Sequence, residues 1–120
     1  MVDGCSYQGG ADSHFGAIHL HGAESWRFDG VEVAATGQYG VFIEDANTDI
    51  TLSGCFIHDI GAGGVRVGIA ASGTLPDPAQ LTTGVVIEDC TIADGGRIIT
   101  AGEGLMWQSA AHGTIRHNEV

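Results

Sequence analysis

The chain has 120 residues, enough for one small domain, and its 20 glycines and 43% hydrophobic residues are typical of a turn-rich β protein rather than a disordered chain. Fifteen acidic residues against four arginines, with no lysine, give a formal net charge of −11. Without a basic stripe to neutralise phosphates, no nucleic acid and no membrane surface is expected as a partner. No apolar stretch reaches the roughly 18 residues that span a bilayer, and no signal-peptide pattern is present, so the sequence itself does not define a compartment.

A three-residue corner recurs along the chain, each time between alternating apolar residues. It reads DGC at 3–5, DGV at 29–31, SGC at 53–55, EDC at 88–90 and RHN at 116–118. Between these corners, the apolar runs GAIHL, GVFIE, GVRVG and GLMWQ begin at Gly16, Gly40, Gly64 and Gly104. A repeat of about two dozen residues without a helical stripe predicts a β-solenoid. The third repeat is longer, and its extra residues are assigned to a loop insertion at 69–80.

We therefore expect an all-β fold, a right-handed parallel β-helix of about four to five coils, as one segment over residues 1–120. Each coil stacks on the next at about 4.8 Å, so equivalent residues form columns. Coil corners are expected near Cys5, Val31, Cys55, Cys90 and Asn118. Two inward columns are expected: Phe28, Leu52, Ile87, Ile115 and Val33, Ile57, Ile92, Val120. The cysteines are expected to be buried thiols, with a Cys55–Cys90 bridge left open, and the Asn118 amide to bond the turn backbone.

The pair His58-Asp59 ends one repeat just before a glycine-rich turn. Aligned on the corners, His58 is level with Ala93 and Asp59 with Asp94. Stacked coils would place the two aspartates roughly 5 Å apart, near the separation of about 5 to 5.5 Å in retaining glycosidases. Like charges that close would raise the pKa of one carboxyl, as a general acid requires. An alternative stays open, in which the aspartates cap the turns by accepting hydrogen bonds from glycine amides.

The outward side chains of the glycine-led strands are expected to share one surface. The expected columns are Ile18, Phe42, Arg66, Met106 and Leu20, Glu44, Gly68, Gln108. An aromatic ring, an arginine, a carboxylate and an amide on one face suit a sugar. Arg97 and Glu103 follow Asp94 in a long turn and are placed to extend the same groove, with the 69–80 insertion as a wall. Solvated surface charge is the simpler explanation for part of this set.

Residues 40–120 resemble the β-helix repeats of glycoside hydrolase family 141, within a group of secreted bacterial carbohydrate-active proteins. The likeness rests on HDIGAGGVRVG at 58–68, LTTGVVIEDCTIADGGRI at 81–98 and AGEGLMWQSAAHGTIRHNEV at 101–120. It implies a secreted or periplasmic protein that acts on a polysaccharide or oligosaccharide. Members of that family have more coils, so a fragment is also implied, with end-to-end self-association through uncapped coils as a further expectation.

Two functions follow as hypotheses. The first is part of a glycoside hydrolase-like enzyme, inactive as an isolated segment, with Asp59 and Asp94 as catalytic carboxylates. Its expected substrate contacts are Glu44, His58, Arg66, Arg97, Glu103 and Gln108. The second is a non-catalytic β-helix scaffold or a carbohydrate-binding or adhesive module.

No cofactor and no metal ligand is assigned from the sequence. A calcium-dependent lyase that uses Glu44, Asp59 and Asp94 with Arg66 or Arg97 ranks below hydrolysis. His19 and His21 share one face of a strand, and we expect a packed or surface pair there rather than a metal site.

Overall fold

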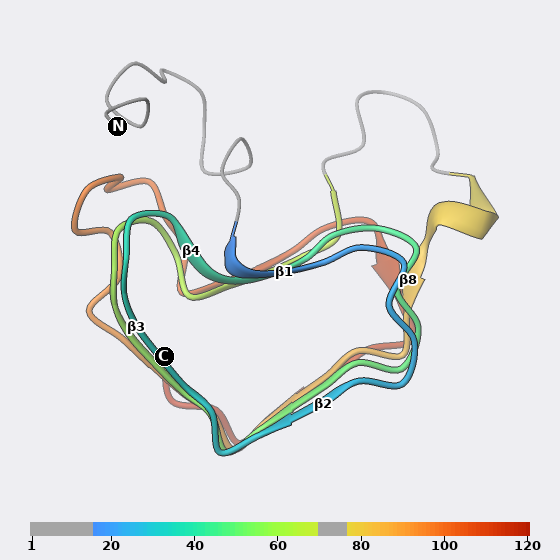
Figure 1. Ribbon diagram of the computed structural model, residues 1–120, viewed down its shortest axis with the longest axis horizontal. Coiled ribbons are helices and arrows are strands. Elements are labelled where there is room, and N and C mark those ends of the chain that lie inside the picture. The colour runs from blue at the N-terminus through green and yellow to red at the C-terminus, as the bar shows by residue number, and fades with distance from the viewer. Residues whose placement is uncertain (1–15, 70–76) are drawn as a thin grey trace.

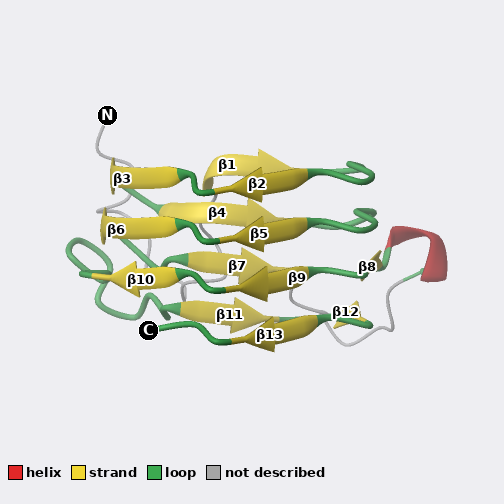
Figure 2. Ribbon diagram, turned by 90° about the horizontal axis from the view of Figure 1, so that it is seen from below, coloured by secondary structure: helices red, strands yellow, loops and turns green. Residues whose placement is uncertain are grey.

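Three stacks of parallel strands enclose a common interior in the structure, a computed structural model that describes residues 16–69 and 77–120. Viewed down the stacking axis, successive coils superimpose (Figure 1), and from the side they lie in layers (Figure 2). Each coil visits the three stacks in the same order, and the two 4-stranded stacks give the described residues four coils. The predicted fold of stacked parallel β-coils is confirmed.

The strands group into three main sheets and a short fourth one. The β1 sheet contains β1 (Gly16–Leu20), β4 (Tyr39–Ile43), β7 (Val65–Val67) and β11 (Leu105–Trp107). The β2 sheet contains β2 (Arg27–Asp29), β5 (Thr51–Ser53), β9 (Val86–Glu88) and β13 (Thr114–Arg116). The β3 sheet contains β3 (Glu32–Thr36), β6 (Phe56–Ile60) and β10 (Thr91–Ala93). In the fourth sheet β8 (Thr82–Thr83) pairs with β12 (Ala110–Ala111), and the 3₁₀ helix η2 (Pro78–Gln80) precedes β8.

Apolar columns fill the interior of the middle coils in the predicted register. Phe28, Leu52, Ile87 and Ile115 pair across the β2 sheet, and Val33, Ile57 and Ile92 pair across the β3 sheet. In the last coil, the predicted inward residues Ile115 and Val120 are exposed, because no further described coil covers them. Leu52, Ile57 and Ile87 are buried in the middle coils, where each contributes about 1.5–3 kcal/mol of burial free energy. Across the described ranges, no helix is long and apolar enough to cross a membrane.

A column of glycines lets the β1 sheet approach the β3 sheet closely. Gly40, Gly64 and Gly104 occupy equivalent positions in neighbouring coils. Each glycine directly precedes one of the residues that pair across the β1 sheet, Val41, Val65 and Leu105. A Cβ atom on Gly64 would meet the Cγ2 methyl of Ile92 and would lie 2.6 Å from the Gly104 carbonyl oxygen, so only glycine fits. The prediction that Gly16 is a fourth member is wrong: it pairs with Tyr39, because the connection 21–26 is shorter than the equivalent connection 44–50.

Two asparagines bond the turn backbone of a neighbouring coil. Asn47 is fully buried, and its Oδ1 accepts a hydrogen bond from the Ala23 amide at 2.9 Å while its Nδ2 donates to the Leu20 carbonyl oxygen at 3.0 Å. Asn118 does the same at another corner, as predicted. Its Oδ1 accepts from the Cys90 amide at 2.9 Å, and its Nδ2 donates to a carbonyl oxygen of that coil at 2.8 Å.

The cysteines of the corner column are packing residues. Cys55 and Cys90 are both buried and both free, as expected for small apolar side chains, and no bridge joins them. Burial raises the pKa of the Cys90 thiol. Cys5 lies outside the described residues.

Candidate functional site

His58 and Asp59 lie together on the outer side of the β3 sheet because the strand alternation breaks between them. Ile57 and Ile60 are the buried side chains of β6, which leaves two consecutive residues outside. The break is at Asp59, whose φ of 53° lies in the left-handed region that aspartate tolerates better than most residues. Asp94, one coil further, has a φ of 51° at the equivalent position.

A group of charged side chains converges around His58. Its Nε2 lies 2.8 Å from Glu32 Oε1, and its Nδ1 lies 2.8 Å from Asp59 Oδ2. The other Asp59 oxygen, Oδ1, is 2.6 Å from the Arg97 guanidinium. The structure therefore brings together three predicted site residues, His58, Asp59 and Arg97, and adds Glu32.

An aromatic ring completes this surface. Phe56 stacks on His58 with ring centroids 4.1 Å apart and an interplanar angle of 22°. It is 43% exposed, although it is a large apolar side chain. Phe56, Glu32, His58, Asp59 and Arg97 are called the His58 cluster below.

The two carboxylates set the protonation state of His58. Both ring nitrogens can donate only when the imidazole is protonated, so the hydrogen bonds to Glu32 and Asp59 raise the pKa of His58 above its ordinary 6.5. The hydrogen bond from His58 and then the charge of Arg97 lower the pKa of Asp59. The sequence predicts a raised pKa for one of the two aspartates, and Asp59 shows the opposite shift. An ionised Asp59 does not suit a general acid.

Asp94 has different surroundings from Asp59. The two residues lie at equivalent positions in neighbouring coils, as predicted, since Ala93 pairs with His58. Asp94 lines a hollow of about 390 Å³ together with Glu119 and Val120, and Asp59 is not part of that lining. Among the described residues, the Asp59 carboxylate contacts the side chains of His58 and Arg97, and no turn amide there donates to it.

Arg66 is a buried member of the outward column of the β1 sheet. The column consists of His19, Phe42, Arg66 and Met106, so the prediction of Ile18 in first place is wrong. The Arg66 guanidinium lies 4.4 Å from the centre of the Phe42 ring. The His19 ring stacks on the same Phe42 ring, with ring centroids 4.9 Å apart. Arg66 is only 4% exposed, so it offers a substrate little surface.

Glu44 lies at a different corner from the His58 cluster. The prediction that Leu20 lies outside beside Glu44 is wrong, because Leu20 is buried in the interior. His21 lies beside Glu44 instead. Glu44 Oε2 is 2.6 Å from His19 Nε2, and Asp45 follows it in the chain. In the fourth coil the side-chain oxygen of Gln108 is buried and makes no hydrogen bond with any described residue.

Glu103 is bound to the β1 sheet. Its Oε2 accepts a hydrogen bond from the Tyr39 hydroxyl at 3.0 Å, and burial together with this bond raises the pKa of Tyr39.

The residues considered for calcium, Glu44, Asp59 and Asp94, do not form one ligand group within 16–69 and 77–120. The group of three ligands that these ranges do contain is His21, Glu44 and Asp45.

A family model described as a right-handed beta helix region matches residues 2–120. The chain belongs to this right-handed β-helix family. The match agrees with the handedness predicted from the repeat. No curated protein and no solved structure shows significant similarity to the chain. The resemblance to glycoside hydrolase family 141 stays an expectation.

The sequence analysis of this β-helix protein missed Glu32, Phe56 and Asp45, and it assigned His21 to a packed or surface pair rather than to a group with two carboxylates. A signal for two of them was available, since Glu32 and Phe56 pair across neighbouring coils in the same register as the predicted inward column. His21 and Asp45 depended on the register of β1, which the glycine marker misplaced.

We expect the stabilising contribution of His58 in this β-helix protein to depend on pH. Its folded pKa is raised, so the contribution is full below the ordinary value of 6.5 and is lost as the pH rises through the folded pKa. Asp59 has a lowered pKa, so its contribution is present above 3.8 and is lost as the pH falls through the folded value. Thermal unfolding across pH 3–9 checks this. The Tm of wild type should exceed the Tm of His58→Gln by the largest amount between pH 3.8 and pH 6.5.

His117→Gln is the matched control for this experiment. His117 is an exposed histidine whose nearest described carboxylate oxygen, on Asp89, is 3.6 Å away. Because this distance is too long for a strong hydrogen bond, the Tm of His117→Gln should stay close to that of wild type. A Tm gap for His58→Gln that widens toward pH 9 would contradict the assignment.

Proposed function

We propose that this protein is a β-helix scaffold that binds a neutral saccharide at the His58 cluster. The observation that carries the proposal is the half-exposed Phe56 ring, which lies among charged hydrogen-bonding side chains on one face of the β3 sheet. Rigid strands position Phe56 and His58, and the turn after β10 supplies Arg97. Such a surface combines an apolar platform with polar groups that fix orientation.

The Phe56 ring supplies the apolar part of the contact. The C–H face of a pyranose is flat and apolar, and it can cover an exposed aromatic ring while its hydroxyls stay at the ring edge. Because Phe56 already stacks on His58, little rotamer freedom is lost when a sugar covers it.

The charged residues supply both kinds of hydrogen-bonding partner. A sugar hydroxyl donates and accepts, so it needs an acceptor and a donor nearby. Glu32 and Arg97 meet this need, with side chains that are 66% and 58% exposed. A carboxylate only accepts and a guanidinium only donates.

The charge of the chain favours a neutral ligand. The formal net charge is −11, and the His58 cluster itself contains the carboxylates of Glu32 and Asp59. Arg97 and protonated His58 offset these two carboxylates within the cluster, so an acidic polysaccharide would be repelled by the net charge of the whole chain, with little screening at low ionic strength.

Binding of saccharides by the full chain tests the proposal. Affinity electrophoresis against neutral polysaccharides such as β-glucan, xylan and mannan, with polygalacturonate as the acidic comparison, should show retardation by a neutral polymer only. Phe56→Ala should weaken that binding about tenfold, which corresponds to about 1.4 kcal/mol. The matched control is Trp26→Ala, which removes a 55% exposed aromatic ring beside Phe28 at another position of the coil.

The two variants separate the possible outcomes. Loss of binding in Phe56→Ala with retention in Trp26→Ala supports the proposal. Absence of binding to every neutral polymer, or equal binding by Phe56→Ala and wild type, overturns it.

Hydrolysis is a second candidate function, favoured by the level positions of Asp59 and Asp94. Strands one coil apart are separated by about 4.8 Å, near the spacing of carboxyl groups in retaining glycosidases. The lowered pKa of Asp59 would suit a nucleophile, which leaves Asp94 as the acid. Reducing-end release, measured on the same polymers at saturating concentration, should then disappear in Asp59→Asn. A wild type that binds and releases no sugar leaves binding as the function.

A further inference from the structure

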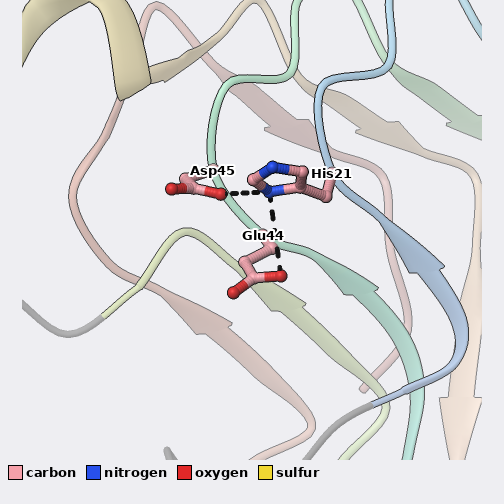
Figure 3. Close-up of side chains that lie close together, drawn as sticks. All are labelled: His21, Glu44 and Asp45. Carbon is pink, nitrogen blue, oxygen red and sulfur yellow. Dashed lines mark ion pairs between the residues drawn. The ribbon is translucent and has the colours of Figure 1, made fainter.

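Three metal-ligating side chains meet where the turns after β1 and β4 stack. His21 follows β1, and Glu44 and Asp45 follow β4 in the next coil (Figure 3). His21 Nδ1 lies 2.5 Å from Asp45 Oδ1 and 4.0 Å from Glu44 Oε2. One donor atom from each residue lies within 4.8 Å of the other two.

The backbone beneath these side chains is fixed in register. The Glu44 amide donates to the Leu20 carbonyl oxygen at 2.8 Å, and the Gly22 amide donates to the Asp45 carbonyl oxygen at 3.2 Å. Buried Asn47 ties the same two turns together through its side-chain amide. The donors are therefore held by ordered backbone rather than by mobile loops, which lowers the entropic cost of binding.

The donor atoms are arranged for a shared cation. Asp45 Oδ1 is buried, and its contact within the described residues is the ion pair with the imidazole nitrogen of His21, which lacks hydrogen-bond geometry. His19 Nε2 lies 2.6 Å from Glu44 Oε2 and holds this carboxylate in place from the strand side. Such outer contacts to a ligating carboxylate are typical of metal sites.

We infer that His21, Glu44 and Asp45 bind a divalent cation of the zinc class. One imidazole nitrogen with two carboxylates is a donor set for Zn²⁺ rather than for Ca²⁺, which takes six to eight oxygens. Bond lengths of about 2.0–2.2 Å in a tetrahedral site separate ligand atoms by about 3.4 Å. The observed separations of 2.5 and 4.0 Å lie on both sides of that value, so small side-chain rotations suffice. Three protein ligands leave the fourth position to water.

Titration of the untagged full chain with Co²⁺ tests the inference. Co²⁺ alone is the probe, because its visible absorption reports tetrahedral coordination and its competition with Zn²⁺ reports affinity. Wild type should bind one equivalent, and His21→Ala should bind at least about tenfold more weakly. Glu44→Gln should weaken binding similarly, since it keeps the shape of the side chain and removes the charge.

The matched control for this titration is His117→Ala. His117 is also exposed and also lies near a carboxylate, Asp89, but without a third ligand grouped with them in the described residues. Its Co²⁺ affinity should equal that of wild type. Absence of saturable binding by wild type, or equal binding by His21→Ala and wild type, would show that His21 and Asp45 form an ion pair only and would overturn the inference.

Discussion

Replacing Asn47 by alanine is expected to lower the free energy of unfolding by about 2–4 kcal/mol, because two backbone groups lose their partners at a fully buried side chain. The Ala23 amide and the Leu20 carbonyl oxygen are both bonded by the Asn47 side chain. The hydrogen bond to the Leu20 carbonyl oxygen is buried, so removal of the amide leaves that oxygen without a partner. Urea unfolding followed by circular dichroism measures the change.

Asn118→Ala is the matched control for this substitution. Asn118 makes the same pair of backbone hydrogen bonds, at 2.9 and 2.8 Å, but it is only half-buried in the last described coil. Water can replace its amide there, so the loss should be about 1 kcal/mol. Equal losses in the two variants would show that burial of the Asn47 turn does not set the cost.

Gly64→Ala is expected to destabilise the protein by about 1–3 kcal/mol through overpacking. The added methyl group would collide with Ile92 of the β3 sheet and would lie 2.6 Å from the Gly104 carbonyl oxygen. Relief requires separation of two packed strands, since both neighbours are held by the coil. The free energy of unfolding in urea is again the measurement.

Two further variants identify the cause of the Gly64 effect. Gly37→Ala adds the same methyl group where no atom of the described residues lies within 4 Å, and it should leave stability nearly unchanged. In an Ile92→Ala background the cost of Gly64→Ala should fall, because part of the collision is gone. If Gly64→Ala destabilises the Ile92→Ala variant as much as it destabilises wild type, the strain comes from the contact with the Gly104 carbonyl oxygen alone.

The fold could be predicted from the sequence because a single repeating pattern determines most of the strand register. Period, corner glycines and alternating apolar residues define the register of the β2 and β3 sheets, and Leu52 and Ile57 pair as expected. The register of β1 could not be predicted in this way. The connection 21–26 is shorter than its equivalent 44–50, so an alignment on Gly16 places Leu20 outside when it is in fact buried.

The candidate site was only partly predictable. His58, Asp59 and Arg97 were found because a charged pair before a glycine turn and an arginine in the next turn are visible in the sequence. The burial of Arg66 against Phe42 depends on packing that spacing does not report. Phe56 resembles any other outward strand residue until its exposure is known.

The two proposed sites lie at different corners of the coil. The His58 cluster lies on the β3 sheet, while the turn that follows β1, which contains His21 in sequence, lies on the side of β8 (Figure 1). Neither shares a side chain with the other. Failure of the saccharide proposal would therefore leave the metal proposal standing, and the reverse also holds.

The most direct test of the central claim is an NMR titration of histidine-labelled protein with neutral oligosaccharides. The chain has six histidines, of which His58 reports on the proposed saccharide surface and His21 on the proposed metal site. We predict that a neutral oligosaccharide shifts the ring resonances of His58 and leaves those of His21 and His117 unchanged. If no neutral oligosaccharide shifts His58, or if a bound sugar shifts other histidines alone, the account is contradicted.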